Sequence, residues 1–279
     1  MYSINITTTS SRTELCSATV WSLINQSVTP KNINIWVSKE PYLSDAGISD
    51  IPEWVDELNK IKNIVRFKFT ENTGPYRKVL PALRTANDDE SIVYADDDVI
   101  YGRLWLENII NIYHKYNKEN IVASRVRLIK NNFFNRKMSY LRYEVCLNEK
   151  TLKDNFIITG IGGCILSKKH IKENLLYNDD YKYVAPKTDD IWISKIIELS
   201  KTKVTCAPLA LDYIFEIDHT VNALNQDNNY HAKKRNFLLK LIDGVFIKIV
   251  SYFGCKISKN DMAIEHVNSY FLNSSENNF

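Results

Sequence analysis

The stretch Ser91-Ile92-Val93-Tyr94-Ala95-Asp96-Asp97-Asp98 decides the fold, because it joins a short apolar run to three consecutive carboxylates. The run is rich in β-branched and aromatic residues and follows the polar segment Asn87–Glu90, a pattern that predicts a buried strand. In an open α/β sheet, ligands bind at the carboxyl ends of the strands. Three carboxylates at one strand end repel one another unless positive charge lies there. Since hard divalent cations bridge carboxylates to phosphates, the stretch predicts a metal that holds a diphosphate.

The same acids have a second interpretation, as the beginning of a helix. Residues 103–116 are predicted to be helical because apolar side chains recur there with helical spacing. Asp is a common N-cap and acidic residues favour the first helical turn, so Asp97 or Asp98 could begin this helix. A D-x-D motif alone has many chance matches. The rest of the chain must therefore decide between the two.

Length and composition indicate an ordinary globular protein. The chain has 279 residues, of which 44% are hydrophobic and 25% charged, enough for one large domain or two small ones. Its net charge of +3 is too small to argue for nucleic acid as a partner. The five cysteines form no C-x-x-C pair, which predicts reduced thiols in a cytosolic protein. We expect neither a signal peptide nor a membrane-spanning helix.

The first hundred residues alternate between predicted strands and helices. Strands are predicted at 4–8, 33–38, 64–69 and 92–95, and helices at 14–25, 53–60 and 77–86, with Ser10, Ser11 and Thr13 as N-cap candidates for the first helix. This order predicts a parallel sheet with helices on both faces. Later predictions are a strand at 121–130, a polar loop at 131–153, a glycine-interrupted strand at 156–166, a helix at 191–200, a strand at 204–208 and a final helix within 233–253.

Four sequence blocks, in this order, resemble a glycosyltransferase of the GT-A fold. They are Thr7–Arg12, Asn72–Lys78, Tyr94–Asp98, and Thr159–Cys164 followed by Thr188–Trp192. The closest likeness is to exostosin-like, retaining transferases, and bacterial family-2-type transferases are a near second. The resemblance implies an α/β, Rossmann-like fold with a mostly parallel central sheet. It implies a catalytic domain at 1–235, with a nucleotide-binding half at 1–102 and an acceptor half at 103–235, and a basic amphipathic helix and tail at 236–279.

The resemblance also implies a nucleotide-sugar site with a bound metal. Asp98 and Asp96 would form the site of Mn²⁺ or Mg²⁺ on the diphosphate. Asp98 would be the direct metal ligand, Asp96 would contact the ribose or the metal through water, and Asp97 would lie between them. Further contacts to the nucleotide sugar would come from Thr8, Thr9, Ser10, Arg12, Asn72, Arg77, Lys78, Gly162, Gly163 and His231.

Each of these assignments has a purely structural alternative. The loop 8–12 could be a helix cap, and Gly160, Gly162 and Gly163 could form a β-bulge or a tight strand crossing. Arg77 and Lys78 could form a solvated helix start, although basic residues are electrostatically unfavourable there. His231 could be a surface histidine, since Tyr230 stands where such enzymes commonly carry a Trp.

Asp189 and Asp190 match the later acidic pair of GT-A enzymes. In an inverting enzyme Asp190 would be the general base that deprotonates the acceptor hydroxyl. In a retaining enzyme it would instead stabilise positive charge beside the anomeric carbon. The alternative is an N-cap for helix 191–200, for which Asp189 is the better candidate.

The segment 233–259 carries seven basic residues and one acidic residue among many apolar ones. Such a basic amphipathic helix suits an anionic membrane surface and a lipid-linked acceptor. The alternative is a final helix that packs on the core.

The leading hypothesis is therefore a metal-dependent hexosyl- or N-acetylhexosaminyl-transferase. It would use a UDP-sugar and a glycan or lipid-linked acceptor in cell-surface polysaccharide or lipopolysaccharide synthesis, in the cytoplasm or on the inner face of the plasma membrane. The first alternative is a sugar nucleotidyltransferase, which normally needs a glycine-rich basic loop, whereas loop 8–12 has no glycine. The second is a non-catalytic, carbohydrate-binding relative, in which the acids would be lost.

Overall fold

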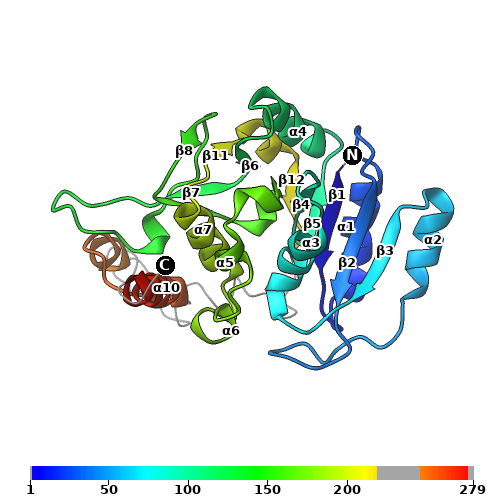
Figure 1. Cartoon of the computed structure of the whole chain (residues 1–279), viewed down its shortest axis with the longest axis horizontal. Coiled ribbons are helices and arrows are strands. Elements are labelled where there is room, and N and C mark those ends of the chain that lie inside the picture. Colours follow the sequence, from blue (N-terminus) through cyan, green and yellow to red (C-terminus); the bar gives the residue numbers. More distant parts are fainter. Residues whose placement is uncertain (1, 219–245, 276–279) are drawn as a thin grey trace.

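The computed structural model describes residues 2–218 and 246–275, and its centre is an eight-stranded sheet (Figure 1). In spatial order the strands are β3 (Val65–Phe69), β2 (Asn32–Val37), β1 (Ser3–Thr7), β4 (Ser91–Tyr94), β10 (Cys164–Ser167), β6 (Ile121–Ala123), β11 (Val204–Cys206) and β8 (Thr151–Leu152). The first four run parallel, β10 is antiparallel to both of its neighbours, β11 is parallel to β6, and β8 is antiparallel to β11. The predicted α/β fold with a mostly parallel sheet is confirmed.

Helices cover both faces of this sheet. One face packs against α1 (Thr13–Ile24), α2 (Glu53–Ile61) and α4 (Trp105–Lys115). The other packs against α3 (Leu80–Thr85), α5 (Glu173–Leu176), α6 (Tyr181–Val184), α7 (Asp189–Leu199) and α10 (Lys259–Ser275). Alternate side chains of β4 enter the two cores, Ile92 and Tyr94 on one face and Val93 on the other. This explains why the strand is a continuous apolar run.

The first hundred residues fold close to their predicted element boundaries, with two differences. The predicted helix 77–86 is a 3₁₀ helix, η1 (Gly74–Lys78), followed by α3. Pro75 and Pro81 each stand in a first turn, where a missing N–H costs little, so the chain begins a helix twice. Arg12 occupies the N-cap of α1 and no side chain caps it, so the predicted capping role of Ser10, Ser11 or Thr13 is wrong.

The predicted strand 121–130 is split between two sheets. After β6, the Ser124 hydroxyl donates to the Gly162 carbonyl, and the Ser124 amide donates to the Gly163 carbonyl. The chain then leaves the main sheet and continues as β7 (Val126–Leu128), which pairs with β9 (Phe156–Ile158). The glycine-interrupted strand likewise divides into β9, the 3₁₀ helix η3 (Gly160–Gly162) and β10. A second small ribbon, β5 (Val99–Tyr101) with β12 (Ile214–Glu216), directly follows the three Asp residues.

The C-terminal part adds a helix that the sequence analysis did not predict. Helix α10 packs on α7, and the Phe271 ring lies 5.0 Å from that of Trp192 at a tilted angle. Of the predicted helix 233–253, residues 246–252 are helical, whereas 233–245, His231 and the domain boundary after residue 235 lie outside the described residues. Within the described residues, every helix is too short or too polar to cross a bilayer.

Candidate active site

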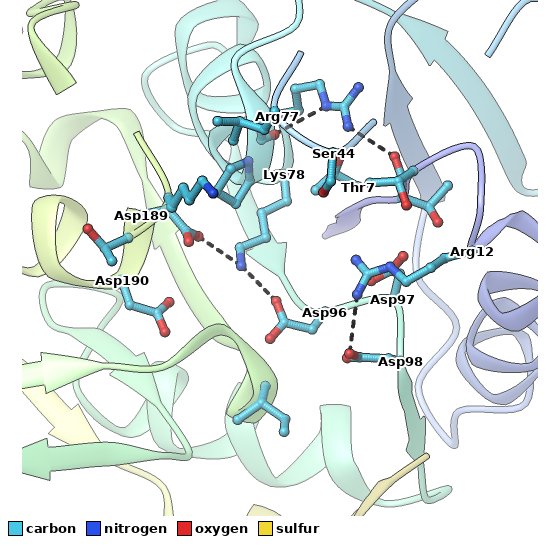
Figure 2. A pocket seen from close by; sticks show the side chains of 18 of the residues that line it. Thr7, Arg12, Ser44, Arg77, Lys78, Asp96, Asp97, Asp98, Asp189 and Asp190 are labelled. Atoms are coloured by element: carbon cyan, nitrogen blue, oxygen red, sulfur yellow. Dashed lines mark hydrogen bonds and ion pairs between the residues drawn. The ribbon is translucent and has the colours of Figure 1, made fainter. Parts of the chain in front are cut away.

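A cavity of about 470 Å³ opens at the carboxyl ends of β1 and β4, within the usual size range of small-molecule sites (Figure 2). Its wall is built by the loop after β1, a loop at 42–45, η1, the three acids after β4, the start of α7 and the chain after β12. Ten of the predicted site residues line it: Thr8, Thr9, Arg12, Arg77, Lys78, Asp96, Asp97, Asp98, Asp189 and Asp190.

Neighbouring elements fix the backbone of the three acids. The Thr19 hydroxyl of α1 donates to the Asp97 carbonyl at 2.8 Å and accepts from the Val99 amide at 3.1 Å. On the other side, the Asp96 amide donates to the phenol oxygen of Tyr101 in β5 at 3.1 Å. The turn therefore faces the cavity because α1 and β5 hold both of its ends.

Arg12 is the cation that faces Asp97 and Asp98. Its Nη2 lies 2.7 Å from Asp97 Oδ1 and its Nη1 lies 3.4 Å from Asp98 Oδ2. Burial raises the pKa of Asp97 to about 6, against the charge of Arg12, which lowers it. A basic N-cap is unfavourable for α1 by itself, so these carboxylates explain its position.

Lys78 is buried between the first of the three acids and the start of α7, as Figure 2 shows. Its Nζ lies 2.7 Å from Asp96 Oδ1 and 2.8 Å from Asp189 Oδ2. Burial lowers the pKa of Lys78, but the charges of Asp189 and Asp96 outweigh it and raise the pKa well above its usual value. Neither acid caps a helix: Thr188 is the N-cap of α7, so the N-cap alternative for Asp189 is wrong.

Arg77 makes a separate buried ion pair that shapes the nearby loop. Its Nη2 donates to Asp45 Oδ2 at 2.9 Å and to the Thr8 carbonyl at 3.0 Å. Asp45 Oδ1 in turn accepts the amides of Ser10 and Gly47. Arg77 thus ties the loop after β1 to loop 42–45, and the predicted solvated helix start is wrong because the side chain is buried.

Asp190 is the acid best placed to act on a proton. Its Oδ1 accepts the Gly160 amide at 3.0 Å, and the side chain lines the cavity beside Asp189. Burial and then the negative charge of Asp189 raise the pKa of Asp190 well above its usual value. A carboxylate with a raised pKa is a stronger base, which suits it for accepting a proton.

The charge of the cavity fits a divalent cation. Among the described residues, eight acidic and four basic side chains line it, an excess of four acidic groups. No three His, Cys, Asp or Glu side chains gather as a metal cluster in residues 2–218 and 246–275. Asp96 and Asp98 could supply one or two carboxylate ligands, leaving other positions to phosphate oxygens and water, which is the usual arrangement for Mg²⁺.

The C-terminal helix helps to build the cavity wall. Asp261, in the first turn of α10, accepts the Tyr140 amide at 2.6 Å and the Ser139 hydroxyl at 2.8 Å. It also accepts two bonds from Ser258 and one from the Ile257 amide. Tyr140 and the adjacent Asn260 both line the cavity. This set of five hydrogen bonds, the Asp261 clamp, therefore joins α10 to the site.

The sequence model of glycosyl transferase family 2 matches residues 6–175, more than half of the chain. This chain belongs to glycosyl transferase family 2. The family-2 likeness, placed second in the sequence analysis, is thus the one confirmed, and with it the GT-A fold. No curated protein matches the chain.

Two structures of S. aureus TarS are similar to this family-2 chain. Each is 17% identical with a TM-score of 0.46 over 74% of this chain. The match covers 57% of the TarS 1–349 structure and 34% of the other, so this chain spans about half of the first and a third of the second.

Four predicted site residues of this family-2 chain do not line the cavity. The Ser10 amide supports Asp45, and the Asn72 side chain donates to the Glu40 carbonyl beside a separate groove. A Cβ at Gly162 would lie 2.5 Å from Cβ of Arg125, and one at Gly163 would lie 2.2 Å from the Trp105 ring. Close packing therefore explains these two glycines, but they lie in and directly after the 3₁₀ helix η3 and not in a β-bulge.

Sixteen residues of the cavity wall were given no site role by the sequence analysis, although some of them lie in the four sequence blocks. They are Thr7, Tyr42, Leu43, Ser44, Asp45, Gly74, Pro75, Tyr140, Ile161, Lys187, Thr188, Ile191, Glu216, Ile217, Asp218 and Asn260. Gly160 was noted but its contact was not: a Cβ there would lie 2.6 Å from both Asp96 Oδ1 and Lys78 Nζ. The two acids Glu216 and Asp218 were a visible signal, since they follow a short apolar segment with an aromatic residue, much as Asp96–Asp98 does.

Proposed function

We propose that this family-2 protein is a metal-dependent glycosyltransferase that moves a hexosyl or N-acetylhexosaminyl group from a UDP-sugar to a glycan or lipid-linked glycan. The observation that carries the proposal is the convergence of Arg12, Lys78 and the three acids after β4 in one cavity with Asp190. The site has a charged end suited to a diphosphate and, beside it, a carboxylate of raised pKa.

Asp96 and Asp98 would hold Mn²⁺ or Mg²⁺, which when bound would neutralise charge on the departing nucleoside diphosphate. Arg12 keeps Asp97 and Asp98 in place and adds positive charge at the same end of the cavity. Lys78 holds Asp96 at a fixed distance from the start of α7. The donor end is therefore organised before any ligand enters, which lowers the cost of ordering it during reaction.

Asp190 would take the proton of the attacking acceptor hydroxyl, which makes the proposed reaction an inverting one. The Gly160 amide holds one of its oxygens, and burial raises its pKa, so the carboxylate is both oriented and more basic. Asp189 supports it indirectly, since its own carboxylate is engaged by Lys78.

The acceptor would enter past Tyr140 and Asn260, which line the cavity on the side of α10. We also propose that the protein acts in cell-surface polysaccharide or lipopolysaccharide synthesis, on the cytoplasmic side of the plasma membrane. The family match favours sugar transfer over the nucleotidyltransferase alternative.

Calorimetric titration tests the donor class. UDP, GDP and CMP are titrated with and without Mn²⁺ into the wild-type protein, Asp98→Ala and the exposed-loop control Asp88→Ala. We expect UDP binding that requires Mn²⁺, is lost in Asp98→Ala and persists in Asp88→Ala. If no nucleotide binds under any condition, the non-catalytic alternative replaces the proposal. A second assay measures the hydrolysis of UDP-sugars. We expect the wild type to hydrolyse them, whereas Asp190→Asn should lose hydrolysis and still bind UDP. This result would distinguish the proposed base from the groups that bind the nucleotide.

A further inference from the structure

Exposed aromatic side chains gather at one end of the molecule. The loop after β7 carries Phe133 and Phe134, which are 89% and 62% exposed. The helical segment 246–252 lies beside this loop, at the end of the molecule opposite α2 and β3 (Figure 1). It presents Phe246, Ile249 and, just past its end, Phe253, all about half exposed or more. We call these five residues the Phe patch.

The Phe patch is one continuous surface. Phe246, Ile249 and Phe253 are spaced as residues on one face of a helix, and the Phe253 amide donates to the Ile249 carbonyl. The ring of Phe253 stacks on that of Phe134 at 6.2 Å, and Phe134 packs edge-on against Phe133 at 5.6 Å. The apolar stripe of the helix therefore runs directly into the loop.

Hydrogen bonds hold the loop in this exposed conformation. Asn132 is buried, and its Oδ1 accepts the amides of Phe134 at 2.9 Å and Arg136 at 3.0 Å. Its Nδ2 donates to the Tyr252 carbonyl, while the Tyr252 hydroxyl accepts the Phe133 amide at 3.1 Å. The two Phe side chains thus project into solvent from a fixed turn, so that docking costs little ordering of the backbone.

Positive charge borders the Phe patch. Arg136, Lys137 and Lys248 are exposed, and none of them forms an ion pair within residues 2–218 and 246–275. Lys130 and Lys256, which are close in sequence, are already paired with Glu144 and Glu265. Exposed Phe side chains bordered by unpaired basic residues are the pattern of a surface that binds anionic lipid headgroups and the acyl boundary beneath them.

This charge and shape favour a bilayer over a protein partner. Lysine is depleted at protein–protein interfaces, and their aromatic anchors fill pockets rather than project from the tip of a turn. A second copy of the chain would bring like charges together across a two-fold axis.

We propose that the Phe patch docks this protein on an anionic lipid bilayer, with Phe133 and Phe134 entering the headgroup–acyl boundary and Arg136, Lys137 and Lys248 contacting lipid phosphates. The inference names the surface that would bring about the membrane location included in the proposed function, and it does not rest on sugar transfer. Ser139 and Tyr140 follow the loop directly, and Tyr140 lines the cavity. Docking therefore sets the wall of the cavity that contains Tyr140 towards the membrane surface.

Vesicle co-sedimentation of the full chain tests the proposal. Vesicles of phosphatidylcholine alone are compared with vesicles that contain about 30% phosphatidylglycerol, at low salt and at about 0.5 M NaCl. We expect binding to the anionic vesicles at low salt. Phe133→Ser should weaken it about tenfold or more, because a Phe side chain is no longer transferred from water. Lys137→Gln should weaken it about fivefold.

Matched controls lie elsewhere on the surface. Tyr183→Ser removes an aromatic side chain that is 86% exposed on α6, and Lys60→Gln removes an exposed charge on α2. Both should bind vesicles as the wild type does. Three results would overturn the proposal: an equal loss of vesicle binding in the patch and control variants, equal binding to neutral and anionic vesicles, or no binding to any vesicle. So would a concentration-dependent dimer that Phe133→Ser dissociates. Because every substituted side chain is exposed, unchanged thermal unfolding is expected, and UDP binding by calorimetry tests the proposed function separately.

Discussion

Replacing Lys78 by Met tests the central ion pairs of the site. The substitution removes the ammonium that lies 2.7 Å from Asp96 and 2.8 Å from Asp189 but keeps the length of the aliphatic chain. The Lys78 and Asp189 side chains are 7% and 9% exposed, so one carboxylate would stay buried without its partner. Removing one partner of a buried pair costs about 3–5 kcal/mol. Because Asp96 keeps more contact with solvent, we expect about 3 kcal/mol.

Urea denaturation at neutral pH measures this loss, and two further variants sharpen it. Lys182→Met breaks the exposed pair with Glu71, which has the same 2.7 Å separation, and should cost less than about 1 kcal/mol. Asp189→Asn added to Lys78→Met removes the uncompensated charge and should recover about 1–2 kcal/mol. If Lys78→Met costs no more than Lys182→Met, the ion pairs do not organise the site and the reasoning fails.

Two other predictions concern packing and pH. Gly160→Ala places a Cβ 2.6 Å from both Asp96 Oδ1 and Lys78 Nζ, so this ion pair must shift. The free energy of unfolding should therefore fall by about 1–3 kcal/mol. Unchanged unfolding and unchanged UDP binding would contradict this contact. Burial lowers the pKa of His170 to about 4, below its usual 6.5, so the fold favours the neutral ring. The stability from His170 is then present above pH 6.5 and lost as pH falls towards 4. It should be about 2 kcal/mol smaller at pH 5 than at pH 7. Denaturation of the wild type and His170→Gln at both pH values isolates this part, because the loss of stability from pH 7 to pH 5 should be about 2 kcal/mol larger in the wild type than in the variant.

The sequence was sufficient for the first half of the fold because its signals are local. Apolar spacing separates strand from helix there, and buried parallel strands such as β4 appear as continuous apolar runs. The same reasoning failed at Ser124, where the chain leaves the sheet. That break depends on the approach of Gly162, 38 residues later, and no local pattern records it.

The lining of the cavity was predictable where an acidic residue follows a strand or begins a helix, as Asp98 and Asp190 do. It was not predictable where a residue acts through a distant partner. Asp45 lies in an irregular loop, and it belongs to the site because Arg77 reaches it from η1. Arg77 and Lys78 were expected to point at a ligand, yet their nearest partners are acids of the protein itself.

The Asp261 clamp limits which segments can be exchanged between members of this family. The family match ends at residue 175, whereas the wall formed by Tyr140 and Asn260 depends on a helix that begins at Lys259. Replacing the C-terminal segment of this chain by another would therefore change a wall of the cavity. A working chimera would have to transfer Ser139 and Tyr140 together with the Asp that binds them. Acceptor choice could then diversify through paired changes in two distant stretches of sequence, while the donor end stayed the same.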